Sequence, residues 1–292
     1  MINKAIILAG GMGTRMSPLT KAVNKQLLPI YDKPLIYYPL SVMMIAKIKD
    51  ISIIVDPKYK KNYINLLGNG ENFGIKINYF EQEKPNGLPE AFILTEKHIK
   101  NSNVCLILGD NIFYGQGLKD YLDRGKKNKI GATIYSYQIK NPQNFGVIIF
   151  DKNNKPIKIE EKPKQPKSNY AVTGLYFYDK HVSTYSKKLK PSKRGELEIT
   201  DLNKIYLKKK KLKVEILGRG FAWLDTGSSE NLLAASQFVE TIEKRQGYKI
   251  ACLEEIAFRN KWLSKIKLKK NLNKMAENNY KKYLLKIIEE TI

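Results

Sequence analysis

Short apolar runs alternate with longer amphipathic segments through the first half of the chain. The apolar runs have the length and composition of buried strands, at 5–8, 51–55, 77–80 and 104–108. The segments between them have the spacing of helices, near 40–47, 58–67 and 89–100. This alternation predicts an α/β protein with a Rossmann-like sheet, mixed but mostly parallel, flanked by helices.

The pattern changes in the middle of the chain and again near its end. Further strands are predicted at 130–139, 146–150, 156–160, 171–178 and 212–217, some separated by turn signals such as 151–154. Beyond residue 228 the spacing favours helices, at 230–243, 253–261 and 277–288. We therefore expect a sheet-containing domain over 1–227, with parts at about 1–115 and 116–227, and a C-terminal helical segment over 228–292.

A glycine cluster, Gly10, Gly11 and Gly13, directly follows the first predicted strand. Such a loop lets backbone N–H groups face a phosphate, and Arg15 and Lys25 add cations nearby. The combination predicts a nucleoside triphosphate held by its phosphates, against the alternative of a simple strand-to-helix turn. The P-loop spacing is absent, and the third glycine of a dinucleotide fingerprint would fall at Met16.

Two aspartates follow apolar runs at distant places in the chain. Asp110 lies in Leu108-Gly109-Asp110-Asn111 and Asp225 lies in Trp223-Leu224-Asp225-Thr226-Gly227. Carboxylates at strand ends suit Mg²⁺, although a turn or helix cap explains either one alone. Ligands of open α/β sheets bind at the carboxyl ends of strands, so Gly10 and Asp110 are expected to share one crevice.

The formal net charge of +24 raises the alternative of a nucleic-acid-binding protein. Its lysines are spread along the chain, however, and the run 208–211 follows a predicted helix, which favours a solvated basic surface. No apolar stretch has the length of a membrane span, and we expect no signal peptide and no membrane partner. Cys105 and Cys252 lack metal spacing, which suits a reduced cytoplasmic compartment, and His98 and His181 lie in no hydrolase or zinc motif.

Seven strings in order resemble the signatures of sugar nucleotidyltransferases, and they cover nearly the whole chain. They are 10–20, 25–34, 108–111, 160–163, 172–176, 195–201 and 223–227. The resemblance implies a nucleotidyltransferase fold, Mg²⁺ as cofactor, and transfer of a thymidylyl group from dTTP to glucose 1-phosphate with release of pyrophosphate. Such a reaction opens the dTDP-rhamnose route to surface polysaccharide. It also implies that 1–115 binds the nucleotide and 116–227 the sugar.

The resemblance further assigns roles to individual residues. Asp110 and Asp225 match the metal-binding aspartates, Arg15 and Lys25 would hold the triphosphate and the departing pyrophosphate, and Lys162 matches the lysine that binds the sugar phosphate. Without the resemblance, Lys162 would be taken for part of a solvated charge run. The expected substrate contacts are Gly10, Gly11, Gly13, Thr14, Gln26, Gln82, Gly87, Asn111, Gly146, Glu161, Val172 and Trp223.

Among these contacts, Gln82 and Gly87 are placed at the base and Gln26 near the nucleoside. Glu161 would accept sugar hydroxyls, Gly146 and Val172 would offer backbone contacts to the hexose, and Trp223 either shapes the sugar pocket or packs in the core. The chain departs from the family pattern at Met16, Pro89 and Phe145, none of which removes a charge or a metal ligand.

The apolar and aromatic positions of the C-terminal segment need a surface to pack against. Enzymes that the chain resembles are homotetramers inhibited at an interfacial site, so we expect a homotetramer with dTDP-rhamnose feedback. Arg259 and Glu255 are candidates for that site, with an exposed i,i+4 ion pair as the alternative. Three other functions stay open: the same chemistry with UTP, a non-catalytic sugar-nucleotide sensor, and nucleic-acid binding.

Overall fold

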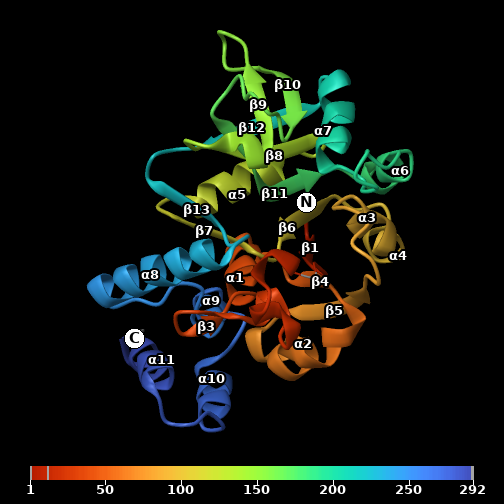
Figure 1. The fold of residues 1–292 in the computed structure, drawn as a ribbon. Coiled ribbons are helices and arrows are strands. Elements are labelled where there is room, and N and C mark those ends of the chain that lie inside the picture. The colour runs from red at the N-terminus through yellow and green to blue at the C-terminus, as the bar shows by residue number, and fades with distance from the viewer. Residues whose placement is uncertain (1, 12, 291–292) are drawn as a thin grey trace.

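A nine-stranded sheet runs through the computed structural model, which describes residues 2–11 and 13–290 (Figure 1). Its parallel part has the order β6-β1-β4-β5, formed by Val104–Leu108, Lys4–Ala9, Asp50–Val55 and Lys76–Glu81. These strands lie within one residue of the predicted ones at each end. The parallel register brings Leu8 opposite both Ile54 and Leu108, so the three strands end at the same edge.

Strand β1 shows why a continuous apolar run becomes a central strand. Ala5, Ile7 and Ala9 point to one face of the sheet and belong to the larger core, whereas Ile6 points to the other face and belongs to a second core. Side chains alternate along a strand, so a strand covered on both faces must be apolar at every position.

The second half of the sheet is mixed and contains all five strands predicted for it. These are β8 Ala132–Gln138, β9 Gly146–Phe150, β10 Pro156–Glu161, β11 Tyr170–Tyr178 and β12 Leu212–Leu217. Strand β11 joins the halves, because it pairs antiparallel with β6 at one end and with β9 at the other, and also with β8. Its register with β8 shifts between Val172 and Tyr176, beside the cavity described below.

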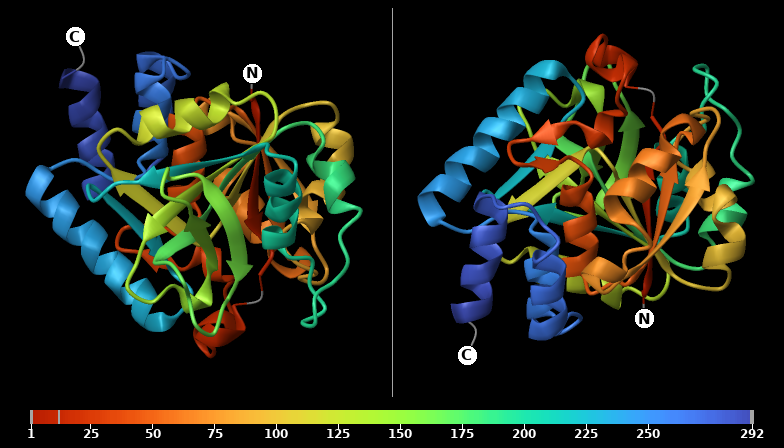
Figure 2. Two further views of the ribbon diagram at one scale, coloured as in Figure 1. Left: turned by 90° about the horizontal axis from the view of Figure 1, so that it is seen from above. Right: turned by 90° about the horizontal axis from the view of Figure 1, so that it is seen from below.

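Helices cover both faces of the sheet (Figures 1 and 2). The larger core contains residues of α1 Tyr37–Ile45, α2 Lys60–Leu67, α5 Leu118–Lys127 and α9 Leu253–Arg259. The second core contains residues of α3 Glu90–Leu94, α4 Glu96–Ile99, α6 Val182–Ser186 and α7 Ile199–Lys208. The predicted helix at 89–100 is therefore two short helices, because Thr95 interrupts it and donates its hydroxyl proton to the Ala91 carbonyl.

Two strands that the sequence analysis missed form a small separate sheet. Strand β7, Asn111–Gly115, pairs antiparallel with β13, Phe221–Asp225, and the register places Asp225 opposite Asn111. Both strands are short and carry polar residues, so neither has a recognisable period alone. Their pairing joins two motifs that are far apart in the sequence. A second pair, β2 Pro29–Ile30 and β3 Lys33–Pro34, lies under α8.

The C-terminal segment is helical, as predicted. Helix α8, Ser229–Gln246, packs against β2 and β13, and α10 Lys265–Leu272 and α11 Asn279–Glu290 pack against α9 (Figure 1). Helix α10 was not predicted. The last helices share a small core of their own that includes Leu268 and Leu284. Among the residues that the structure describes, no helix combines the length and apolar character needed to span a membrane.

Candidate active site

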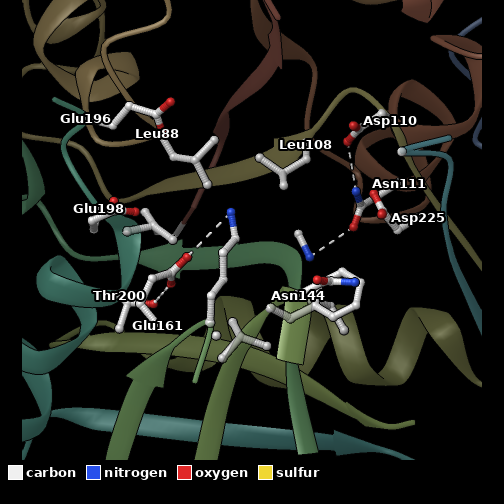
Figure 3. A pocket seen from close by; sticks show the side chains of 18 of the residues that line it. Leu88, Leu108, Asp110, Asn111, Asn144, Glu161, Glu196, Glu198, Thr200 and Asp225 are labelled. Atoms are coloured by element: carbon white, nitrogen blue, oxygen red, sulfur yellow. Dashed lines mark hydrogen bonds and ion pairs between the residues drawn. The ribbon is translucent and has the colours of Figure 1, made fainter. Parts of the chain in front are cut away.

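A cavity of about 620 Å³ opens where the two halves of the sheet meet. Nine of the predicted site residues line it: Arg15, Asp110, Asn111, Gly146, Glu161, Lys162, Val172, Trp223 and Asp225. In Figure 3, Asp110, Asn111 and Asp225 lie together on one wall, while Glu161, Glu198 and Thr200 lie together on another. The cavity therefore has an acidic wall next to the parallel strands and a separate polar wall in the mixed part of the sheet.

The acidic wall is built where β6 and β13 end. Thr226 donates its backbone N–H and its hydroxyl proton to the Asp110 carbonyl, at 3.1 and 2.9 Å, which holds the two carboxylates near each other. Burial and the charge of Asp110 raise the pKa of Asp225 to about 6, and Lys25 and Arg15 oppose this shift. Two carboxylates that repel each other in a half-buried site have a high affinity for a cation.

Cations contact this acidic pair from the side of the glycine loop. Lys25, nearly buried at the start of the 3-10 helix Lys25–Leu27, donates to Asp110 Oδ2 at 2.6 Å. Arg15 approaches from another direction: a Cβ added to Gly227 would lie 3.3 Å from Arg15 Nη2 and 2.8 Å from Asp225 Oδ2. The two predicted phosphate-binding cations and the two predicted metal ligands therefore form one cluster.

Asn111 fixes the geometry of the acidic wall. Its Nδ2 donates to Asp110 Oδ1 at 2.9 Å, and its Oδ1 accepts from the Trp223 indole N–H at 2.6 Å and from the Gly174 backbone N–H at 3.0 Å. Both acceptor positions of its amide oxygen are therefore used within the protein. Trp223 lines the cavity and is also buried, with its ring edge-to-face on Phe145 at a centroid distance of 5.0 Å. Trp223 therefore both shapes the cavity and packs in the core.

The opposite wall carries the predicted sugar-binding residues. Glu161 accepts the hydroxyl proton of Thr200, and Gly146 leaves room for this contact, because a Cβ there would lie 3.0 Å from Thr200 Oγ1. Lys162 follows β10 with φ of 42°, a left-handed conformation that side chains rarely adopt, and its ammonium group lies 4.0 Å from Glu161 Oε1. An exposed ammonium group therefore lies beside a carboxylate that Thr200 holds in place.

The remaining predicted residues do not line this cavity. They are Gly10, Gly11, Gly13, Thr14, Lys25, Gln26, Gln82 and Gly87. Gly13 caps the N-terminus of the 3-10 helix Thr14–Met16 with φ of 62°, a left-handed conformation that favours glycine. Gln26 is buried, and its Oε1 has no hydrogen-bond partner among the described residues, so it is free to accept from a ligand.

Gly87 has a structural reason to be glycine. Its φ is 107°, its backbone pairs with Leu197, and an added Cβ would lie 2.1 Å from the Leu197 carbonyl oxygen. A side chain there would separate the loop before α3 from the segment before α7. The contact of Gly87 with the base stays a prediction.

Several cavity residues were missed from the sequence. Arg194 lines the cavity. Its Nη2 donates to both carboxylate oxygens of Glu198, at 2.8 and 2.9 Å, and reaches Glu161 Oε1 at 3.5 Å. Thr200 and Glu198 lie in the string 195–201, which carried the resemblance but received no roles. Asn144, on the segment before β9, also lines the cavity. Arg194 directly precedes the string 195–201, and this position next to a family motif could have identified it as a candidate site residue.

The residues present fit a magnesium ion. The described residues include no cluster of three or more His, Cys, Asp or Glu side chains that could hold a metal alone. Mg²⁺ is commonly bound by one or two carboxylates together with substrate phosphates and water. Asp110 and Asp225 supply such a partial set, and Lys25 already neutralises part of their charge.

Known proteins resemble this chain over nearly its whole length. The family model described as nucleotidyl transferase matches residues 4–242. Glucose-1-phosphate thymidylyltransferase of Neisseria meningitidis is 55% identical over 287 residues, covering 98% of this chain and 100% of its own, and that of Mycobacterium tuberculosis is 47% identical over 286 residues, covering 98% and 99%. A solved UDP-glucose pyrophosphorylase complexed with UDP-glucose superposes with a TM-score of 0.73 at 26% identity, covering 83% of this chain and all of that one.

The chain therefore belongs to the nucleotidyl transferase family. Its two full-length relatives named above are both glucose-1-phosphate thymidylyltransferases, whereas the UDP-glucose enzyme shares the fold at lower identity. The predicted α/β fold with C-terminal helices is confirmed.

Proposed function

We propose that the protein transfers a thymidylyl group from dTTP to glucose 1-phosphate, giving dTDP-glucose and pyrophosphate. The observation that carries the proposal is the position of the Asp110–Asp225 pair. It lies between the cations and glycine loop on one side and the polar wall around Glu161 on the other. Two anionic substrates meeting there would bring together the α-phosphorus of one and the phosphate of the other.

The reaction is an in-line displacement. A phosphate oxygen of glucose 1-phosphate attacks the α-phosphorus of dTTP, the bond to the β-phosphate oxygen breaks, and pyrophosphate leaves with the electron pair. The attacking oxygen is already anionic at neutral pH, so the site needs no general base. Catalysis then consists of positioning and of neutralising negative charge.

The side chains divide these tasks. Arg15 and Lys25 hold the triphosphate and stabilise the charge that develops on pyrophosphate. Lys162 binds the phosphate of the sugar, and Glu161, fixed by Thr200, accepts hydroxyl protons of the hexose. A magnesium ion held by Asp110 and Asp225 would supply charge neutralisation of the α-phosphate.

The nucleoside would be recognised beyond the glycine loop. Gln82 offers an amide to the base, and the buried Gln26 Oε1 gains a partner when a nucleoside hydroxyl donates to it. The fold is shared with an enzyme bound to UDP-glucose, so it does not decide between thymine and uracil, which differ by one methyl group. UTP is therefore the competing substrate.

We further propose the organisation and setting of the enzyme. Residues 1–115 bind the nucleotide, 116–227 bind the sugar, and 228–292 contribute to a homotetramer with dTDP-rhamnose inhibition at an interface. Arg259 forms an ion pair with Glu255 at 2.7 Å, and Glu255 also accepts a hydrogen bond from the Tyr283 hydroxyl. The alternative to a role in inhibitor binding is that these contacts only stabilise the C-terminal helices. A cytoplasmic location is consistent with the buried free thiols of Cys105 and Cys252.

A product assay tests the proposal. Purified enzyme with Mg²⁺ is given dTTP, UTP, dCTP or ATP together with glucose 1-phosphate, and both pyrophosphate and nucleotide sugar are measured. We expect dTDP-glucose as the main product. A non-catalytic sensor would bind these compounds without turnover, and preferred turnover of UTP would replace the substrate while keeping the reaction.

A further inference from the structure

One end of the Gln82 side-chain amide is held by the protein. Gln82 follows β5, its backbone N–H donates to the Val55 carbonyl at 2.9 Å, and its side chain is buried. Its Nε2 donates to Glu90 Oε2 at 2.6 Å. Its Oε1 faces the glycine loop, because a Cβ added to Gly10 would lie 2.6 Å from that oxygen. The amide therefore spans the space between α3 and the glycine loop.

The carboxylate of Glu90 receives two amides. Glu90 is the first residue of α3, and its Oε1 accepts from Asn86 Nδ2 at 2.8 Å while its Oε2 accepts from Gln82. A carboxylate accepts hydrogen bonds and donates none. If the Gln82 amide rotated by half a turn, its oxygen would face a carboxylate oxygen at hydrogen-bond distance, which is repulsive. Glu90 thus determines which end of the amide is available to a ligand.

The geometry points to Glu90 as the positioning residue that makes the nucleotide site select bases with a ring N–H. This inference rests on the proposed function, in which Gln82 contacts the base. Thymine and uracil carry a donor at N3, whereas cytosine carries an acceptor at that position. An amide oxygen held toward the base accepts from the first two and opposes the lone pair of the third. A freely rotating amide would accommodate both.

The matched variant is Glu90→Gln, which keeps the shape but can donate as well as accept. With it, both orientations of the Gln82 amide have a partner. The measurement is kcat/KM for dTTP and for dCTP at saturating glucose 1-phosphate. We expect the dTTP-to-dCTP ratio to fall by about tenfold or more, the scale of one well-made hydrogen bond to a charged group. The KM for glucose 1-phosphate should not change, because Glu90 lies away from the sugar wall.

The control is Glu83→Gln. Glu83 is exposed and lines the same small cavity as Glu90 and Gln82, so this variant removes an equal charge nearby without freeing the amide. Its ratio should equal that of the wild type. A second variant, Glu90→Ala, removes the partner altogether and should shift the ratio in the same direction. The wild type should also bind 3-methylthymidine triphosphate at least about tenfold more weakly than dTTP, because a methyl group replaces the N–H.

The outcomes separate this inference from the proposed function. If the wild type makes dTDP-glucose and Glu90→Gln leaves the ratio unchanged, Glu90 does not orient the amide and the function still holds. Equal binding of dTTP and its 3-methyl analogue to the wild type also overturns the inference, whether or not the variants fold. If the wild type uses neither dTTP nor UTP, the inference and the proposed function are both wrong.

Discussion

At the scale of single residues, the Asp110–Asp225 pair lowers the stability of the fold while it supplies the carboxylates proposed to bind a metal ion. The pKa of Asp225 is raised to about 6 from its ordinary value of 3.8, so the folded protein binds a proton more tightly than the unfolded chain. The free energy of unfolding therefore decreases as pH rises through this interval, and the loss is complete above it. A cation bound between the two carboxylates would neutralise this charge and remove the loss of stability.

This balance makes a prediction for Asp225→Asn. In metal-free buffer at pH 8 the variant should be more stable than the wild type, by on the order of 1–3 kcal/mol, and the difference should vanish near pH 4. Chemical denaturation at both pH values measures this difference.

Asp225→Asn and Asp110→Asn should each lose at least about 10²-fold in kcat, the scale of removing one electrostatic stabiliser. Near-normal turnover of both variants at saturating Mg²⁺ would remove the metal assignment.

Arg15 and Lys162 should fail in different ways, because they lie on different sides of the carboxylate pair. Arg15→Ala should lower kcat, since the triphosphate and the leaving pyrophosphate lose a cation. Lys162→Ala should mainly raise the KM for glucose 1-phosphate and leave dTTP binding near normal. Titration calorimetry with each substrate checks this. A loss of dTTP affinity in Lys162→Ala, with unchanged affinity for glucose 1-phosphate, would contradict the division of the site.

At the scale of elements, the pairing of β7 with β13 holds the site together, and Asn111 is its central residue. Asn111→Ala would leave the Trp223 indole N–H and the Gly174 N–H without their acceptor and free Asp110 to move. An unsatisfied buried donor costs about 1–3 kcal/mol, so we expect a loss of about 2–4 kcal/mol in unfolding free energy. Denaturant titration measures the loss, and a change below 1 kcal/mol would show that water replaces the amide.

The same elements show what the sequence could and could not predict. The central strands are buried on both faces and are therefore apolar at every position, so their limits were found almost to the residue. Strands β7 and β13 are short and partly polar, and their existence depends on each other across more than a hundred residues. Asp110 and Asp225 could be named from their motifs, but the contacts that hold them close, the β7–β13 pairing and the hydrogen bonds from Thr226, involve both motifs and are not visible in either one.

Contacts between side chains were least predictable. Arg194 lies in a charged segment outside any predicted helix or strand, and Glu90 begins a predicted helix, where a charged side chain is ordinarily expected at the surface. Their partners come from other parts of the chain: Arg194 reaches Glu161, and Glu90 receives Gln82. Gly87 was expected at the base for its place in a motif, yet the backbone of Leu197 explains the glycine.

At the scale of the whole molecule, the C-terminal helices bury only part of their apolar surface within the chain. Leu284 is fully buried, whereas Leu233 on α8 is 60% exposed. We expect light scattering at micromolar concentration to give the mass of four chains, and Leu233→Glu to lower that mass if α8 lies in an interface. A monomeric wild type would remove the tetramer, and dTDP-rhamnose inhibition would then need a site within one chain.

In the proposed reaction, one substrate displaces pyrophosphate directly from the other in the cleft between the two walls. The most direct measurement is the stereochemical course at the α-phosphorus, using a single isomer of dTTP with sulfur at that phosphate and glucose 1-phosphate as acceptor. A single in-line displacement inverts the configuration, so we expect the inverted dTDP-glucose thio-analogue. Retention would show two displacements through a nucleotidylated side chain and would contradict direct transfer.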